Sequence, residues 1–149
     1  MHTAFDRKAD KDLSDSDIAE KNLVLVGTPK QNTVLARIVE KLPVKFLDDG
    51  VEVGGKAYRD KGAGLVMIYP NPLNPKRYVL LMPEWVADTN GRSHGDVENT
   101  LYGFGDYVVG KLGNVGDRGS SVIQVIGKGS FDSRWQVPAG AASVPAGGK

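Results

Sequence analysis

A cluster of prolines constrains this chain more than any other segment. Three prolines fall within six residues of the segment 69–78, which lies between apolar runs at 64–68 and 79–82. Each proline fixes φ near about −65° and lacks a backbone N–H group, and it moves the preceding residue away from the α region. We therefore expect neither a helix nor a central strand to pass through this segment. It is predicted to be a stiff, extended connection that presents Asn71 and Asn74 at the end of a buried strand.

The composition is typical of a soluble globular protein. The chain has 149 residues, the size of one domain, with 40% apolar and 25% charged residues. Nineteen basic and eighteen acidic residues give a formal charge of +1, which argues against a dedicated nucleic-acid binder. There are no cysteines, so disulfides and thiolate metal sites are excluded. We expect no cofactor.

The apolar runs of this chain are short. None approaches the 18 or so residues that a membrane-spanning helix needs. The first residues are charged and contain no apolar signal-peptide segment. We therefore expect no membrane span and no signal peptide, and the compartment is left open.

The two ends of the sequence differ from its middle. Residues 1–12 are charged and aperiodic, as is typical of a flexible arm. Residues 138–149 are a low-complexity run rich in alanine, glycine and proline, which is typical of a flexible tail. We expect a single folded domain over residues 13–137.

The clearest local signals belong to two helices and the strand between them. Ser14 and Asp17 form a capping-box pattern that starts a short helix. The apolar run 22–27 ends in glycine and is typical of a strand buried on both faces. Asn32 is a good N-cap, and apolar residues at helical spacing predict a helix over residues 33–42.

The remaining pattern predicts several more strands. Alternation with turn residues indicates a β-hairpin over 44–55. Further strands are predicted at 64–68, 78–82, 106–109 and 122–127, and a partial helix near 97–102. Buried strands that alternate with a strong helix favour an α/β fold. We expect a small three-layer, Rossmann- or flavodoxin-like sandwich with a mainly parallel sheet and a β-hairpin excursion.

Two strand-end loops are candidate ligand sites. The loop 27–32 precedes a predicted helix, and Thr28, Lys30 and Asn32 offer a hydroxyl, a charge and an amide. In open α/β sheets an anion binds at this place, although the loop matches neither a dinucleotide nor a Walker motif. The alternative is a simple turn that Asn32 caps.

The two asparagines of the proline segment form the second candidate. In a parallel sheet, Asn71 and Asn74 would lie at the same edge as the loop 27–32 and face it, so their amides could bind a polar ligand. The alternative is that each side chain bonds nearby backbone groups and holds the turn, as asparagine commonly does.

A catalytic or metal site has little support in the sequence. The chain has two histidines and no Gly-x-Ser-x-Gly elbow, so a complete serine-hydrolase site is not expected. His94 lies near Asp96 and Glu98, but one histidine without recognisable ligand spacing favours a solvated loop over a metal site. Four aromatic residues either line a sugar-binding or partner surface or complete the core: Trp85, Tyr102, Phe104 and Trp135.

Several segments resemble one bacterial module. The matching segments are 15–27, 42–46, 68–79 and 106–109, with the proline-asparagine stretch as the most specific. The module is the C-terminal domain of exported prolyl-oligopeptidase-like and esterase-like α/β-hydrolase proteins, common in planctomycetes and related bacteria. This resemblance implies an accessory α/β domain from an exported protein, with the catalytic residues in a preceding hydrolase domain.

Three functions remain open from the sequence. The leading hypothesis is a non-catalytic accessory or protein-interaction domain whose partner is a hydrolase domain or a second copy of the chain. The second is a small-ligand domain that binds an anion or a sugar with the loops 27–32 and 69–78. The third, which the sequence supports least, is a metal-dependent enzyme centred on His94.

Overall fold

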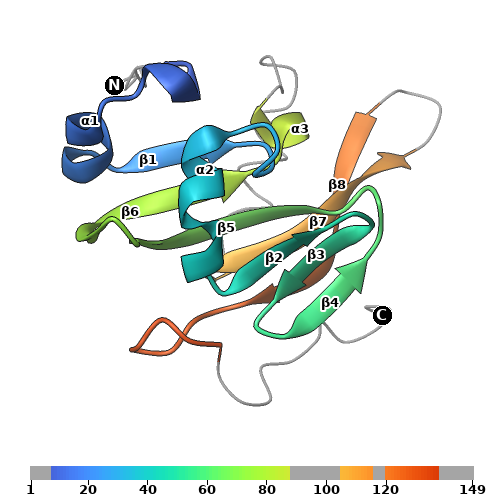
Figure 1. Ribbon diagram of the computed structural model, residues 1–149. Helices are drawn as coiled ribbons and strands as arrows, with labels where there is room; N and C mark the ends of the chain where they lie inside the picture. Colours follow the sequence, from blue (N-terminus) through green and yellow to red (C-terminus); the bar gives the residue numbers. More distant parts are fainter. Residues whose placement is uncertain (1–7, 88–104, 116–119, 138–149) are drawn as a thin grey trace, which may run out of the picture.

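The larger of two β-sheets forms the centre of the molecule (Figure 1). The computed structural model describes residues 8–87, 105–115 and 120–137. Within them the sheet has five strands in the order β1-β6-β5-β7-β8, of which only β1 and β6 are parallel. The strands are β1 (Leu23–Val26), β5 (Gly64–Asn71), β6 (Asn74–Met82), β7 (Tyr107–Val115) and β8 (Ser120–Gly129).

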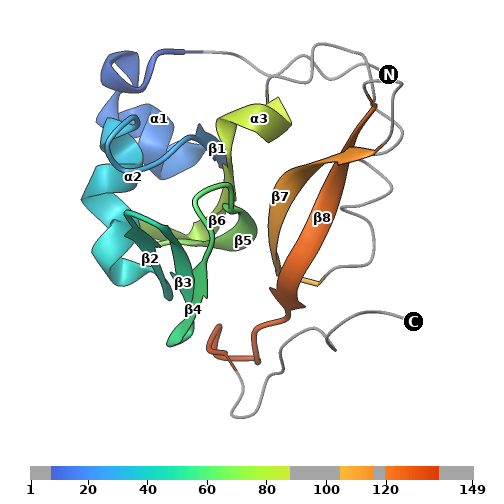
Figure 2. The same ribbon diagram turned by 90° about the vertical axis from the view of Figure 1, so that its right-hand side faces the viewer.

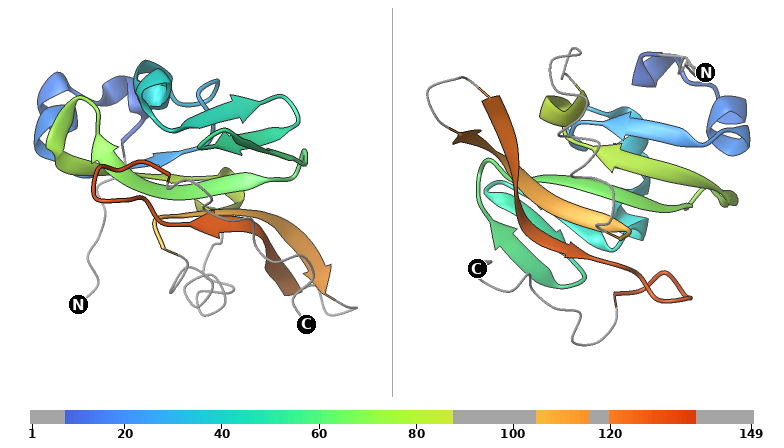
Figure 3. Two further views of the ribbon diagram at one scale, coloured as in Figure 1. Left: turned by 90° about the horizontal axis from the view of Figure 1, so that it is seen from below. Right: turned by 180° about the vertical axis from the view of Figure 1, so that it is seen from behind.

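A second layer covers one face of this sheet. It contains helix α2 and an antiparallel sheet of three strands in the order β2-β3-β4, which lie on the same side of the large sheet (Figures 2 and 3). The hairpin predicted over 44–55 is confirmed, and one further strand extends it. The bounds are α2 (Thr33–Ile38), β2 (Val44–Leu47), β3 (Gly50–Val53) and β4 (Lys56–Arg59).

The other helical segments are short. Ser14 caps helix α1 (Asp15–Glu20) in the predicted capping box with Asp17, and Asn32 caps α2 as expected. The remaining turns are η1 (Asp10–Asp12), η2 (Val39–Lys41) and α3 (Glu84–Ala87). In the part of the chain that the structure describes, no helix is both long and apolar enough to cross a bilayer.

The expected three-layer, mainly parallel Rossmann- or flavodoxin-like sandwich is wrong. The protein is a β-rich, two-layer structure with a mixed sheet and a separate antiparallel sheet. The reason lies in the proline segment, which was expected to be a connection. β5 extends into this segment as far as Asn71, and β6 begins at Asn74. The turn between them has only two residues, Pro72 and Leu73. So short a turn joins antiparallel strands, because a parallel pair needs a long crossover.

The expectation that no central strand could contain the prolines is also wrong. β7 pairs with β5 only over Gly64–Met67, so Pro70 lies past the end of that pairing. Residues two apart in a strand point to the same side, so the Pro70 nitrogen lies on the side of the Ile68 N–H group. That group donates to the Asp106 carbonyl group, just before β7. Pro75 lies at the register shift between β5 and β6. Both positions are places where a strand does not need the missing N–H group.

One hydrophobic core joins the two layers. Alternate residues of β1, β5 and β6 point toward α2 and the small sheet, and they are almost fully buried. Helix α2 contributes Leu35 and Ile38, which are both fully buried, at the helical spacing predicted from the sequence. The strand residues of this core include Leu23, Leu25, Leu65, Met67, Val79, Leu81, Val44, Val51 and Val53.

Two glycines allow β8 to approach aromatic rings. A Cβ atom on Gly127 would lie 2.4 Å from the ring of Tyr58, and one on Gly129 would lie 2.4 Å from the Tyr107 hydroxyl. Tyr58 belongs to β4, so its ring connects the small sheet to the last strand of the large one. The predicted strands at 106–109 and 122–127 are confirmed, and both are longer than expected.

The expected arm and tail are described only in part. Lys8 forms an ion pair with Asp17, and Asp10 contacts the start of α2, so the end of the arm lies against the domain. The predicted tail at 138–149 and the partial helix at 97–102 lie outside the described residues.

Candidate functional site

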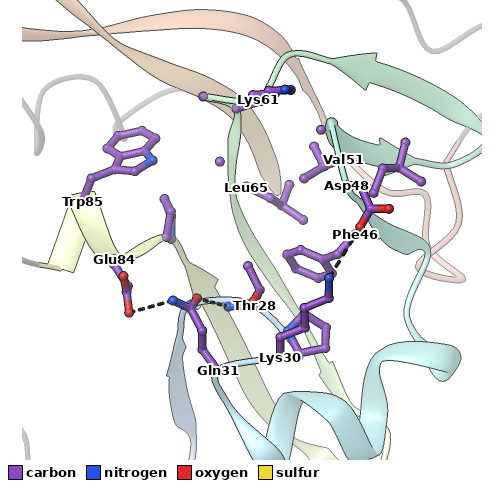
Figure 4. Close-up of a pocket in the computed structure, with 18 residues that line it drawn as sticks. Thr28, Lys30, Gln31, Phe46, Asp48, Val51, Lys61, Leu65, Glu84 and Trp85 are labelled. Atoms are coloured by element: carbon purple, nitrogen blue, oxygen red, sulfur yellow. Dashed lines mark hydrogen bonds and ion pairs between the residues drawn. The ribbon is translucent and has the colours of Figure 1, made fainter.

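A pocket of about 490 Å³ lies at the carboxyl ends of the parallel strands β1 and β6 (Figure 4). Four separate stretches of chain line it. They are the loop after β1 (27–31), the turn between β2 and β3 with its flanking residues (46–51), the loop before β5 (61–65) and the residues after β6 (83–85).

The loop after β1 is held by the side chain of Gln31. Its Oε1 atom accepts a hydrogen bond from the Thr28 N–H group at 3.0 Å, and its Nε2 atom donates to Glu84 at 3.1 Å. Gly27 has φ of 95° and leaves room for this side chain, because a Cβ atom there would lie 2.8 Å from Gln31 Oε1. The loop is therefore fixed to the residues that follow β6.

The floor of the pocket is apolar. Leu65 and Val51, which belong to the shared core, lie at its centre, and Trp85 stands at one side (Figure 4). Phe46 and Pro83 complete this apolar lining. The surface suits the hydrophobic part of a small molecule.

Two lysines line opposite ends of the pocket (Figure 4). Lys30 forms an ion pair of 3.5 Å with Asp48, and these side chains are 86% and 97% exposed, respectively. Lys61 stands at the end of the pocket opposite Thr28 and forms no ion pair with any other described residue (Figure 4). A ligand can therefore displace Asp48 from Lys30 at little cost.

A neighbouring ion pair fixes the loop that carries Lys61. Asp60 accepts a hydrogen bond from Lys111 of β7 at 2.8 Å and another from the Gly62 N–H group at 2.9 Å. Lys111 first, and the Gly62 N–H group second, lower the pKa of Asp60 below its ordinary value. The carboxylate thus ties this loop to the large sheet.

The sequence-predicted candidates divide into two groups. Thr28 and Lys30 line the pocket, whereas Asn32 caps α2 with its Oδ1 atom, which accepts from Val34 and Leu35. The Thr33 N–H group donates to the Asp10 carboxylate at 2.6 Å. The start of α2 therefore has its donors bonded within the chain, which matches the alternative of a simple capped turn for Asn32.

Asn71 and Asn74 lie at the opposite end of the sheet. Their Nδ2 atoms donate to the Ile18 and Ala19 carbonyl groups of α1, and their Oδ1 atoms accept N–H groups of their own turn. The expectation that they face the loop 27–32 is wrong, because β6 begins here and runs parallel to β1 toward that loop. Their contacts match the alternative in which asparagine holds the turn.

The second notable feature is the face of the large sheet that points away from α2. We call it the outer face and define it by six residues in two rows across β1, β6 and β5: Val24, Leu80 and Ile68, then Val26, Met82 and Val66. Val24 and Ile68 are 43% and 37% exposed. Figure 3 shows these strands in front of α2 in the view from behind. The sequence interpretation missed this face because it treated the apolar runs as strands buried on both sides.

An aromatic cluster closes the sheet beside the end of β5. Trp135 packs near Tyr69, Tyr78 and Phe131, with ring centroids 5.7 to 6.1 Å away. It is the one described residue other than glycine with positive φ, at 60°. Asp132 holds this turn by accepting the N–H groups two and four residues ahead. Of the four aromatics singled out in the sequence, Trp135 joins this cluster, Trp85 lines the pocket, and Tyr102 and Phe104 lie outside the described residues.

The metal hypothesis cannot be placed on this structure. His94 and the carboxylates near it lie outside the described residues. Among the residues that are described, no group of three or more histidine, aspartate or glutamate side chains is arranged to hold a metal ion.

Comparison with known proteins adds no relative. No protein-family model matches the chain, and no curated protein or solved structure matches it either. The resemblance to the hydrolase-associated module therefore stays a prediction.

Proposed function

We propose that this chain is a non-catalytic accessory domain that packs through its outer face against an α/β-hydrolase domain of the same polypeptide. The observation that carries the proposal is the composition of that face. A sheet face that stays in water normally alternates to polar residues, whereas valine, leucine, isoleucine and methionine occupy all six positions here.

The size of the face favours a tethered partner over a free one. Three strands are about 4.8 Å apart and the two rows are about 7 Å apart, so the six side chains cover on the order of 200 Å². A stable complex of separate proteins buries about 800 Å² on each partner. A covalently linked domain needs less contact area, because the linker supplies an effective concentration in the millimolar range.

The sequence resemblance supplies the identity of the partner. In proteins that carry the similar module, a hydrolase domain precedes it and holds the catalytic residues. The interaction role requires no catalytic group in this chain, and it accounts for exposed apolar residues that otherwise lower solubility.

The test uses the lack of cysteine in this chain. The full product of the gene is expressed beside the isolated domain, each with Ile68→Cys or, as a matched control, Leu73→Cys. These two residues are 37% and 38% exposed, but Leu73 lies in the turn outside the outer face. Maleimide labelling is followed by mass spectrometry of the peptide that carries the new thiol.

We expect labelling at Ile68→Cys to be at least about tenfold slower in the full product, and labelling at Leu73→Cys to be unchanged, because only the outer face is covered. Equal rates at Ile68→Cys, or a reading frame without a hydrolase domain, would contradict the proposal. Light scattering of the isolated domain completes the test. If the isolated domain is a dimer and Ile68→Asp makes it a monomer, the partner is a second copy of the chain. That result would exclude the tethered hydrolase domain as the partner.

A further inference from the structure

The pocket at the ends of β1 and β6 is built from parts that the docking role does not use. It lies between the loop after β1 and the loop before β5, whereas the outer face lies on the strands themselves. Its volume of about 490 Å³ falls within the range of about 300–1,000 Å³ that small-molecule sites occupy.

The lining separates into an apolar part and a charged part. Leu65, Val51 and Trp85 provide the apolar surface, and Lys30 and Lys61 line opposite ends of the pocket (Figure 4). The hydroxyl of Thr28 adds a neutral donor or acceptor. A ligand that fits both parts has a hydrophobic body and an anionic group.

The acidic residues of the pocket leave the lysines accessible. Glu84 accepts a hydrogen bond from Gln31, which in turn holds Thr28, so it belongs to the loop structure. Asp48 pairs with Lys30 at 3.5 Å, and both side chains are almost fully in water. Such exposed pairs contribute little free energy, so a ligand carboxylate can replace Asp48 as the partner of Lys30.

We propose that this pocket binds a small carboxylate with an aromatic or aliphatic body. The body contacts Leu65, Val51 and Trp85, and the carboxylate takes the place of Asp48 beside Lys30. A sugar is a poorer fit, because its many hydroxyl groups would lose water without partners over an apolar floor.

Calorimetry with 2-naphthoate tests the proposal on the full chain at low salt. The neutral amide and the cationic amine with the same ring serve as charge controls, and glucose tests the sugar alternative. We expect one naphthoate per chain, weaker binding of the amide and weakest binding of the amine. Added salt lowers the affinity, because it screens the lysines.

Variants locate the site. Lys30→Gln reduces the affinity for naphthoate about threefold, and Lys61→Gln, at the far end of the pocket, reduces it less. Lys45→Gln is the matched control, since Lys45 is an exposed lysine of β2 that does not line the pocket. Ile68→Asp leaves the affinity unchanged and thereby separates this site from the outer face.

Other results overturn the proposal. They are equal affinity for the acid and the amide, tighter binding of glucose than of naphthoate, unchanged affinity in Lys30→Gln, or absence of saturable binding. None of them bears on docking through the outer face, and thiol labelling at Ile68→Cys does not test the pocket.

Discussion

Asp10 accepts a hydrogen bond from the Thr33 N–H group at 2.6 Å, although 23 residues separate the two. The carboxylate thus serves the first turn of α2, where Asn32 bonds the next two N–H groups. An anion of the chain itself occupies the place where a ligand anion was considered. This contact also connects the segment before α1 to the second layer.

Removal of Asp10 should destabilise the protein in a pH-dependent way. The Thr33 N–H group holds the pKa of Asp10 below its ordinary value of 3.8. The contact therefore stabilises the fold above about pH 4, and the stabilisation is lost as the pH falls through the lowered value. We expect Asp10→Ala to lower the urea midpoint at pH 6 and to lower it less at pH 2.5. Asp48→Ala, at an exposed carboxylate, serves as the control. An equal loss at both pH values would contradict the role of the charge.

Asn71 should contribute to stability rather than to ligand binding. It is only 1% exposed and bonds both the Ile18 carbonyl group and the Leu73 N–H group. Asn71→Ala leaves both groups without a partner, and we expect a loss of about 2 kcal/mol or more in the free energy of unfolding. Naphthoate affinity of the folded variant should not change. A loss below about 0.5 kcal/mol would show that the amide has no structural role.

Gly127→Ala should push β8 away from Tyr58. The added methyl group would lie 2.4 Å from the ring, and we expect a loss of about 1–3 kcal/mol measured by urea unfolding. Gly62→Ala is the control, because its nearest neighbour would be 3.4 Å away. In a double-mutant cycle with Tyr58→Leu, the cost of Gly127→Ala should fall. Full additivity would mean that the ring is not what Gly127 accommodates.

The position of a proline within β5 should decide its effect. Pro70→Ala restores an N–H group where β7 no longer pairs, so we expect a change of about 1 kcal/mol or less, through the entropy of the unfolded chain. Val66→Pro removes an N–H group where β5 pairs with β7 and should cost about 3 kcal/mol or more. Thermal unfolding followed by circular dichroism measures both. Similar costs for the two variants would refute this account of the sheet edge.

Local signals in the sequence predicted local structure well. The capping box at Ser14, the cap at Asn32 and the apolar strand runs all occur as expected, because each depends on neighbours in the chain. The fold class failed at Pro72 and Leu73, where a two-residue turn was taken as part of a longer connection. That error reversed the direction expected for β5 and placed Asn71 at the wrong end of the sheet.

The pocket was found only in part for a related reason. Thr28 and Lys30 follow a strand, which is a readable signal, whereas Lys61, Val51 and Trp85 come from three other stretches. Two contacts bring them together: the packing of the small sheet against β5 and the pairing of β5 with β6. The exposure of Ile68 depends likewise on which face the second layer covers.

The single parallel pairing has a consequence for the order of folding. Asn22 and Tyr78, at the start of this pairing, bond each other across 56 residues, whereas the neighbouring strands of each hairpin are joined by short turns. Closing so long a loop is slow in comparison with forming a hairpin. We expect β1 to join a preformed β5–β6 hairpin late in folding. The row that contains Val24 is then complete only once the rest of the domain has formed, so the proposed partner would bind the finished fold and none of its earlier intermediates.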